Sequence, residues 1–126
     1  SHPDVLAVTA TDDTTRRFEG ANVGGYLDVA APGVSIIVAA PDAAYDLMDG
    51  TSFAAAHVSG VAALVLALNP EIGREELSAL LARTARDLGE PGRDEFYGAG
   101  LVDAARAVSP PPAAAADAPA RVGSGR

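Results

Sequence analysis

Three short stretches in the first third of the chain consist almost wholly of apolar residues. They are Val5 to Ala10 (VLAVTA), Tyr26 to Ala31 (YLDVAA) and Val34 to Ala40 (VSIIVAA), and the last two are closed by Pro32-Gly33 and Pro41. A run that is apolar at nearly every position, rather than at alternate positions, is typical of a strand in a sheet covered on both faces. We therefore predict three buried strands.

A longer apolar run predicts a helix that is apolar on every side. Phe53 to Leu68 reads FAAAHVSGVAALVLAL and is stopped by Asn69-Pro70, where proline cannot continue a helix. At about 1.5 Å per residue this helix would be roughly 24 Å long, which is short for the hydrocarbon core of a bilayer. Because it also carries His57, Ser59 and Gly60, we predict a buried central helix and no membrane span.

The second half of the chain predicts two more helices and a tail. From Arg74 to Arg86 (REELSALLARTAR), leucines recur at spacings of three and four, which indicates an amphipathic surface helix. A glycine-containing turn, Tyr97 to Asp103, leads into a short helix from Ala104 to Val108. Residues 109–126 are rich in proline, alanine and glycine and are typical of a linker or disordered tail.

These elements make an α/β body over residues 1–108, followed by the tail at 109–126. A helix apolar on all sides needs cover on all sides, which fewer than 110 residues with about three strands can hardly provide. The chain also lacks an initiator methionine and a signal peptide at its N-terminus. We therefore expect the fold to be incomplete, with a missing part outside these residues.

Charge and composition exclude some partners. Seventeen acidic residues against nine arginines, with no lysine, give a net charge of −8, which opposes binding to nucleic-acid phosphates. No cysteine is present, so neither disulfides nor a thiolate zinc site is possible. Asp42, Asp46 and Asp49 are predicted to lie in one loop after Pro41, but they lack the spacing and closing glutamate of an EF-hand. We therefore identify no metal site and no cofactor in this segment, and we expect no nucleic-acid partner.

Chemistry is concentrated in the stretch MDGTSFAAAHVSG at 48–60, which contains Ser52 at a loop-to-helix junction. The first backbone N–H groups of a helix have no partner within the helix and favour negative charge, which suits an oxyanion. Serine and threonine are also favoured as helix-capping residues. On spacing alone, Ser52 is therefore either a nucleophile or, like Thr51, a capping residue.

The nearby histidine and aspartate are not suitable partners for Ser52. Five helical positions turn His57 by roughly 140° and raise it by about 7.5 Å, so its ring faces away from the serine hydroxyl. We interpret it as a buried, hydrogen-bonded helix residue. His2 lies at the extreme N-terminus, where nothing holds it opposite Ser52, and Asp49 has no reachable histidine to orient. We expect Asp49 to be a solvated loop carboxylate.

Four segments together resemble the C-terminal half of a subtilisin-like serine peptidase, a subtilase, over Ser1 to Val108. They are HPDVLAVTATD (2–12), LDVAAPGVSI (27–36), DGTSFAAAHVSGVAAL (49–64) and FYGAGLVDAARAV (96–108). The glycine-threonine-serine block before an alanine-rich helix is the most specific of them. The resemblance implies a three-layer α/β subtilisin-like fold with a mostly parallel sheet, present here as its C-terminal half only.

By resemblance, Ser52 is the attacking serine, with its own backbone N–H as one oxyanion donor, and Thr51 supports that oxyanion hole. In this family the aspartate, the histidine and an asparagine of the oxyanion hole precede the serine, so all three are expected upstream of Ser1. The chain departs from the family pattern at Phe53, usually methionine, and at Ala56, usually proline. Residues 18–24 match the family's phenylalanine-serine-asparagine turn only loosely.

The resemblance implies a serine endopeptidase that acts on protein or peptide substrates outside the cell or in the cell envelope. We expect the 126 residues alone to be inactive, because base, acid and one oxyanion donor are missing. Two alternatives stay open: a non-catalytic packing or binding module in which Ser52 only caps its helix, and an intracellular processing enzyme. Substrate preference and calcium binding are not readable from these residues.

Overall fold

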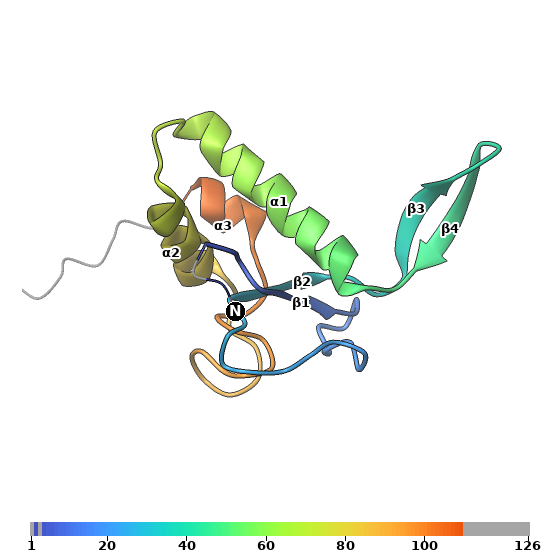
Figure 1. Cartoon of the computed structure of the whole chain (residues 1–126), viewed down its shortest axis with the longest axis horizontal. Coiled ribbons are helices and arrows are strands. Elements are labelled where there is room, and N and C mark those ends of the chain that lie inside the picture. The colour runs from blue at the N-terminus through green and yellow to red at the C-terminus, as the bar shows by residue number, and fades with distance from the viewer. Residues whose placement is uncertain (1, 3, 110–126) are drawn as a thin grey trace, which may run out of the picture.

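The computed structural model describes His2 and residues 4–109 (Figure 1). Its elements are β1 Val8–Thr11, β2 Val29–Pro32, β3 Ile36–Ala40, β4 Ala44–Met48, α1 Thr51–Leu68, α2 Arg74–Thr84 and α3 Ala104–Val108. The three predicted helices and three predicted strands are all present, with ends shifted by a few residues, and the bounds of α3 match the prediction. One strand, β4, was not predicted. Apart from Ser109, the predicted tail lies outside the described residues, and its boundary stays a prediction.

A parallel pair of strands forms the centre of the fold. β1 and β2 are in register from Val8 opposite Val29 to Thr11 opposite Pro32. On the other side of β2, Ala30 exchanges two 2.8 Å hydrogen bonds with the backbone of residues 100 and 102. α1 crosses one face of this pair, with α3 and α2 beside it (Figure 1). The α/β class is therefore confirmed, and the core lies between α1 and the parallel strands.

The helix α1 is buried on one side only, so the prediction of a helix buried on all sides is wrong for the described chain. Its buried residues, Ala54, Val58, Val61 and Val65, recur every three or four positions and face the sheet and α3. Away from this stripe, the side chain of Leu64 is 53% exposed. The physical reason is the length of the chain, because too few residues are present to cover the second side of α1.

By length and apolar composition alone, α1 could also cross a membrane, although little of it is buried. A core helix of a soluble protein meets the same criteria. The expectation that this segment does not span a membrane stays a prediction.

The strands β3 and β4 form an antiparallel hairpin that projects from the body (Figure 1). The prediction of a loop after Pro41 is wrong, because Ala44–Met48 pairs with Ile36–Ala40. The prediction that β3 is a buried strand is also wrong, since its residues alternate between half-buried and exposed. The turn escaped prediction because it has no glycine: Asp42 and Ala43 both adopt positive φ, near 60°, a region that glycine, asparagine and aspartate enter more readily than alanine does.

The segment between α2 and α3 is attached to the sheet by charged groups. The Arg93 guanidinium donates to the carbonyl oxygen of Leu27 (2.5 Å) and to the Asp28 carboxylate (3.3 Å). The second carboxylate oxygen of Asp28 accepts from the backbone N–H of Ala7 at 2.8 Å. The Asp28 side chain therefore joins the start of β2 to the segment before β1 and, through Arg93, to the loop before α3.

Candidate active site

Two glycines determine where α1 begins. The N–H of Gly33 donates to the carbonyl oxygen of Thr11 (3.0 Å), and the N–H of Gly50 donates to the carbonyl oxygen of Gly33 (2.7 Å). A Cβ added at Gly33 would lie 2.7 Å from the Gly50 oxygen and 3.2 Å from the Ala54 methyl carbon. Only glycine permits this approach. The first turn of α1 is thereby placed beside the carboxyl ends of β1 and β2, the edge where α/β sheets commonly carry their sites.

Ser52 is the second residue of α1, and its side chain is exposed. The N-cap position is occupied by Gly50, and no side chain caps the helix. Within residues 4–109, neither the hydroxyl nor the backbone N–H of Ser52 forms a hydrogen bond. Neither Thr51 nor Ser52 therefore caps α1 with its side chain. A free hydroxyl beside a free N–H at a helix start can attack an electrophile and stabilise the resulting oxyanion.

Thr51 precedes Ser52 and is turned into the protein. It is half-buried and lines a cavity of about 180 Å³ with Ala7, Val8, Asn22, Tyr26 and Leu27. The role of Thr51 in supporting the oxyanion hole stays a prediction.

His57 is not a partner of Ser52. Its Nδ1 lies 2.9 Å from the carbonyl oxygen of Phe53, one turn back along α1, so the ring follows the helix surface. The predicted hydrogen bond is present, but the predicted burial is wrong, because the side of α1 that carries His57 is uncovered and the residue is exposed. His2 precedes β1 and lies beside Asp4, whereas the first turn of α1 lies at the carboxyl end of that strand. Neither histidine is positioned to act as a base for Ser52.

If the protein has the peptidase activity that the family resemblance implies, substitution of His57 by alanine should leave kcat/KM of the natural-length protein within about tenfold of wild type, since a residue without contact to the reacting atoms contributes only through packing. Peptide hydrolysis measured at several pH values checks this. The variant His57→Gln, which can still donate to the Phe53 carbonyl, is the matched control. A loss beyond about a thousandfold in a folded His57→Ala protein would make His57 a catalytic group.

Asp49 fastens the base of the hairpin. Its Oδ1 accepts a 2.7 Å hydrogen bond from the backbone N–H of Ser35, although the residue is exposed. This contact joins the two ends of the β3–β4 hairpin just before the first turn of α1. The expectation of a solvated loop carboxylate is confirmed, because Asp49 is exposed in the loop before α1. Its hydrogen bond to Ser35 lay beyond the reach of local sequence reasoning, since the two residues are fourteen positions apart.

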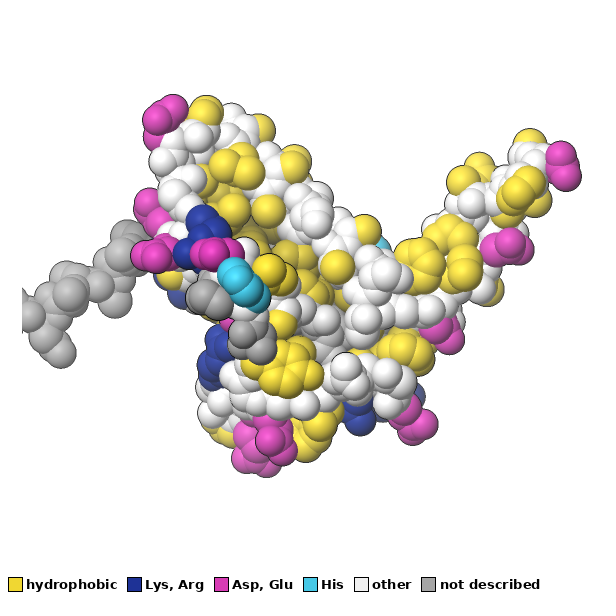
Figure 2. All heavy atoms as spheres, in the orientation of Figure 1, with side chains coloured by type: hydrophobic (Ala, Val, Ile, Leu, Met, Phe, Trp, Pro, Cys, Tyr) yellow, Lys and Arg dark blue, Asp and Glu magenta, His cyan; other side chains and the backbone are white. Residues whose placement is uncertain are grey.

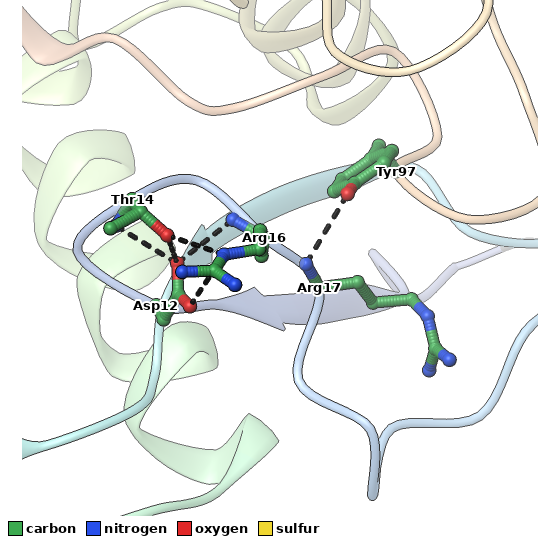
Figure 3. Close-up of polar contacts among 5 residues, drawn as sticks. All are labelled: Asp12, Thr14, Arg16, Arg17 and Tyr97. Atoms are coloured by element: carbon green, nitrogen blue, oxygen red, sulfur yellow. Dashed lines mark hydrogen bonds and ion pairs between the residues drawn. The ribbon is translucent and has the colours of Figure 1, made fainter.

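A second polar cluster lies in the loop that follows β1, at the same edge of the sheet (Figure 3). Asp12 Oδ1 accepts from the Thr14 hydroxyl (2.7 Å) and from the backbone N–H groups of Thr14 (2.9 Å) and Arg16 (2.8 Å). The Tyr97 hydroxyl accepts from the N–H of Arg17 at 3.2 Å. The hydrogen bond from the Thr14 hydroxyl is the main reason that the pKa of Asp12 is lowered from its ordinary value of 3.8.

We expect Thr14→Val to raise the pKa of Asp12 back toward 3.8, because the variant removes the largest stabilising contact of the carboxylate. Since the folded pKa is lowered, the carboxylate contacts stabilise the loop above the unfolded pKa and are lost as pH falls through the folded pKa. Carbon-13 NMR titration of the Asp12 carboxyl measures the shift. Thr14→Ser keeps the hydroxyl and serves as control. Equal pKa values in wild type and Thr14→Val would contradict the assignment.

No group of three or more histidine, cysteine, aspartate or glutamate side chains suited to a metal ion occurs among the described residues. Of the aspartates considered for calcium, Asp42 lies in the hairpin turn and Asp46 on β4, while Asp49 bonds to Ser35. The expectation of no cofactor in this segment stays a prediction.

The chain matches the family model described as the subtilase family over residues 1–100. It is similar to subtilisin DY of Bacillus licheniformis, with 37% identity over 102 residues, which are 81% of this chain and 36% of that protein. It is also similar to the M-protease of Shouchella clausii, with 39% identity over 107 residues, 85% of this chain and 27% of that protein.

Among solved structures, the chain is similar to fervidolysin of Fervidobacterium pennivorans, described as a keratinolytic enzyme related to subtilisin. The TM-score is 0.79 at 30% identity, over 87% of this chain and 20% of that chain. MycP1, described as a serine protease of a type VII secretion system, gives a TM-score of 0.75 at 30% identity, over 85% and 31% of the two chains. The chain thus has a subtilisin-like fold and spans well under half the length of these relatives.

Proposed function

Because this chain belongs to the subtilase family, we propose that it carries the nucleophile of a serine endopeptidase and that this nucleophile is Ser52. One observation supports the assignment most: Ser52 stands exposed in the first turn of α1, with hydroxyl and N–H both free of partners in the described chain. A capping serine, as in a non-catalytic module, would instead bond to the helix it begins.

The proposed reaction is acyl transfer to Ser52 followed by hydrolysis. The Ser52 Oγ attacks the carbonyl carbon of the peptide bond while a histidine from outside these residues takes its proton. The N–H of Ser52 donates to the developing oxyanion, together with an asparagine, and Thr51 supports this hole. The intermediate then expels the amine, which receives the proton from the histidine. Water hydrolyses the acyl-enzyme in the same way.

The remaining catalytic groups belong, in this proposal, to the N-terminal half of the same domain. The exposed side of α1 supports it: Leu64 and Leu68 are 53% and 68% exposed in an otherwise apolar helix, and such a surface needs a covering layer. A cavity of about 550 Å³ runs along this side between Ile36 and Leu64. We place the whole protein outside the cell or in the cell envelope, in keeping with a relative from a secretion system.

Two measurements test this function. The first treats the natural-length protein, captured from its source with an antibody against this segment, with a fluorophosphonate probe and maps the labelled peptide by mass spectrometry. Labelling of Ser52 is expected. Labelling elsewhere, or none in a protein that hydrolyses peptides, would refute the assignment.

The second measurement assays the isolated 126-residue chain for peptide hydrolysis. We expect none that depends on Ser52, because no base lies within reach of its hydroxyl in the described residues. Serine-dependent turnover by the isolated chain would show that the base is already present in it.

A further inference from the structure

One surface of the hairpin has no partner in the fold described above. Ile37 lies opposite Leu47, and Ala39 lies opposite Tyr45; because residues two apart on a strand point to the same side, these four residues share one face, the outer face. The side chains of Ile37, Leu47 and Tyr45 are 71%, 68% and 75% exposed. Three large apolar side chains side by side on a projecting hairpin are more than scattered surface residues.

The backbone of the hairpin is also incompletely paired. Within the part of the chain that the structure describes, β3 and β4 form a sheet of two strands. Each strand therefore has an edge with unpaired N–H and C=O groups, which is a template for an added strand. An isolated hairpin of this kind gains stability when a third strand joins it. An extended polypeptide can form hydrogen bonds with the unpaired backbone groups of the edge and also cover the apolar side chains of the outer face.

The charges around the hairpin select among such ligands. Asp42 and Asp46 lie at the turn and on β4, and Asp49 lies at the base. Between Arg17 and Arg74 the chain contains no lysine or arginine. Figure 2 shows hydrophobic side chains along the hairpin, with acidic side chains at its tip and along its side. Negative charge repels nucleic acid, an anionic membrane and a second acidic copy of this chain, and attracts a basic polypeptide.

The position of the hairpin relates this surface to Ser52. β4 continues through Asp49, Gly50 and Thr51 directly into the first turn of α1. Tyr45 is seven residues before Ser52, so at most about 25 Å of extended chain separates them. A polypeptide that docks on the outer face therefore has its neighbouring residues within reach of the nucleophile.

We propose that the outer face of the β3–β4 hairpin docks the substrate polypeptide, as an extended segment with alternating apolar side chains and flanking lysine or arginine residues. The inference rests on the proposed function of Ser52 and specifies its substrate class. It makes the hairpin a determinant of which proteins are cut, while small substrates that do not reach it are cut equally well without it.

Peptide binding to the natural-length protein carrying Ser52→Ala, which prevents cleavage, provides the test. Two fluorescent ten-residue peptides share an alternating valine-threonine centre; one has lysine flanks and the other glutamate flanks. Fluorescence anisotropy gives the dissociation constants at low and high salt. We expect the lysine-flanked peptide to bind at least roughly tenfold more tightly at low salt, with a smaller difference at high salt.

Hairpin variants then assign the binding to this surface. The pair Ile37→Ser and Leu47→Ser should weaken binding of both peptides about tenfold or more, and the pair Asp42→Asn and Asp46→Asn should remove most of the preference for lysine flanks. Glu71→Gln, an exposed acid outside the hairpin, is the matched control and should change neither. Equal affinity for the two peptides, or unchanged binding by the hairpin variants, would overturn the proposal. Vesicle binding or self-association that these variants abolish would overturn it as well.

Failure of the docking proposal is distinguishable from failure of the proposed function. In the protein with an intact Ser52, Ile37→Ser with Leu47→Ser should lower kcat/KM for the lysine-flanked peptide and leave fluorophosphonate labelling and hydrolysis of a small ester unchanged. Binding by the hairpin without labelling of Ser52 would refute the nucleophile alone. Labelling of Ser52 without hairpin-dependent binding would refute the docking surface alone.

Discussion

Replacement of Ser52 by alanine is expected to lower kcat for peptide hydrolysis by the natural-length protein about a millionfold, the loss known for removal of the nucleophile in subtilisin itself. Alanine keeps the helix start and the backbone N–H, so binding and the oxyanion donor remain while the attacking oxygen is absent. The loss should therefore appear in kcat far more than in KM. Steady-state kinetics with a peptide substrate, corrected for contaminating peptidases, measure both.

Ser59→Ala is the matched control, because Ser59 lies on the same helix and its hydroxyl only donates to the carbonyl oxygen of Ala55 at 2.8 Å. It should hydrolyse the peptide at close to the wild-type rate. If Ser52→Ala retained more than about one part in a thousand of wild-type kcat, a loss too small for a missing nucleophile, Ser52 would be a binding or structural residue instead.

Gly33→Ala is expected to destabilise the protein and to misplace Ser52. The added Cβ would lie 2.7 Å from both the Ala10 Cβ and the Gly50 carbonyl oxygen, closer than such atoms can approach, and backbone cannot rotate away as a side chain can. Overpacking of this kind costs about 1–3 kcal/mol of the free energy of unfolding. Because Gly50 leads directly into α1, relaxation of the clash moves the first turn, and about 1 Å of displacement can lower the rate by about a hundredfold.

Chemical denaturation and kcat measured on the same preparation separate the two effects. Gly73→Ala is the control, since a Cβ added there meets no atom within 4 Å and the backbone is in a region that alanine adopts readily. Wild-type stability and activity in Gly33→Ala would mean that the contact between the end of β2 and the start of α1 does not position the nucleophile.

The sequence predicted the helices well because their signals are local. The apolar run of α1 and the leucine spacing of α2 are contained within single segments, and Asn69-Pro70 stops the first of them. The hairpin was harder to predict. Its turn uses positive φ at Asp42 and Ala43 rather than glycine, so Pro41 marks the end of β3 but no local pattern marks the return of the chain as β4.

The candidate site shows the same division. Ser52 and Thr51 were singled out from the residue pattern and a family resemblance, and the irrelevance of His57 followed from helix geometry. The bond from Ser35 to Asp49 could not be foreseen, because it joins residues that are distant in sequence. The need for glycine at position 33 was likewise invisible, since it depends on atoms of β1 and α1 that the chain brings together only on folding.

By itself, then, the sequence determined what is periodic or local: the α/β class, the apolar character of α1, and a serine at the start of that helix. Tertiary structure alone decided which side of α1 is buried, that β3 pairs with β4 outside the body, and that the hydroxyl of Ser52 has no partner in the described chain. Periodicity fixes which residues can share a face, but burial depends on how many other residues are present to cover that face. In this chain they suffice for one side of α1 only.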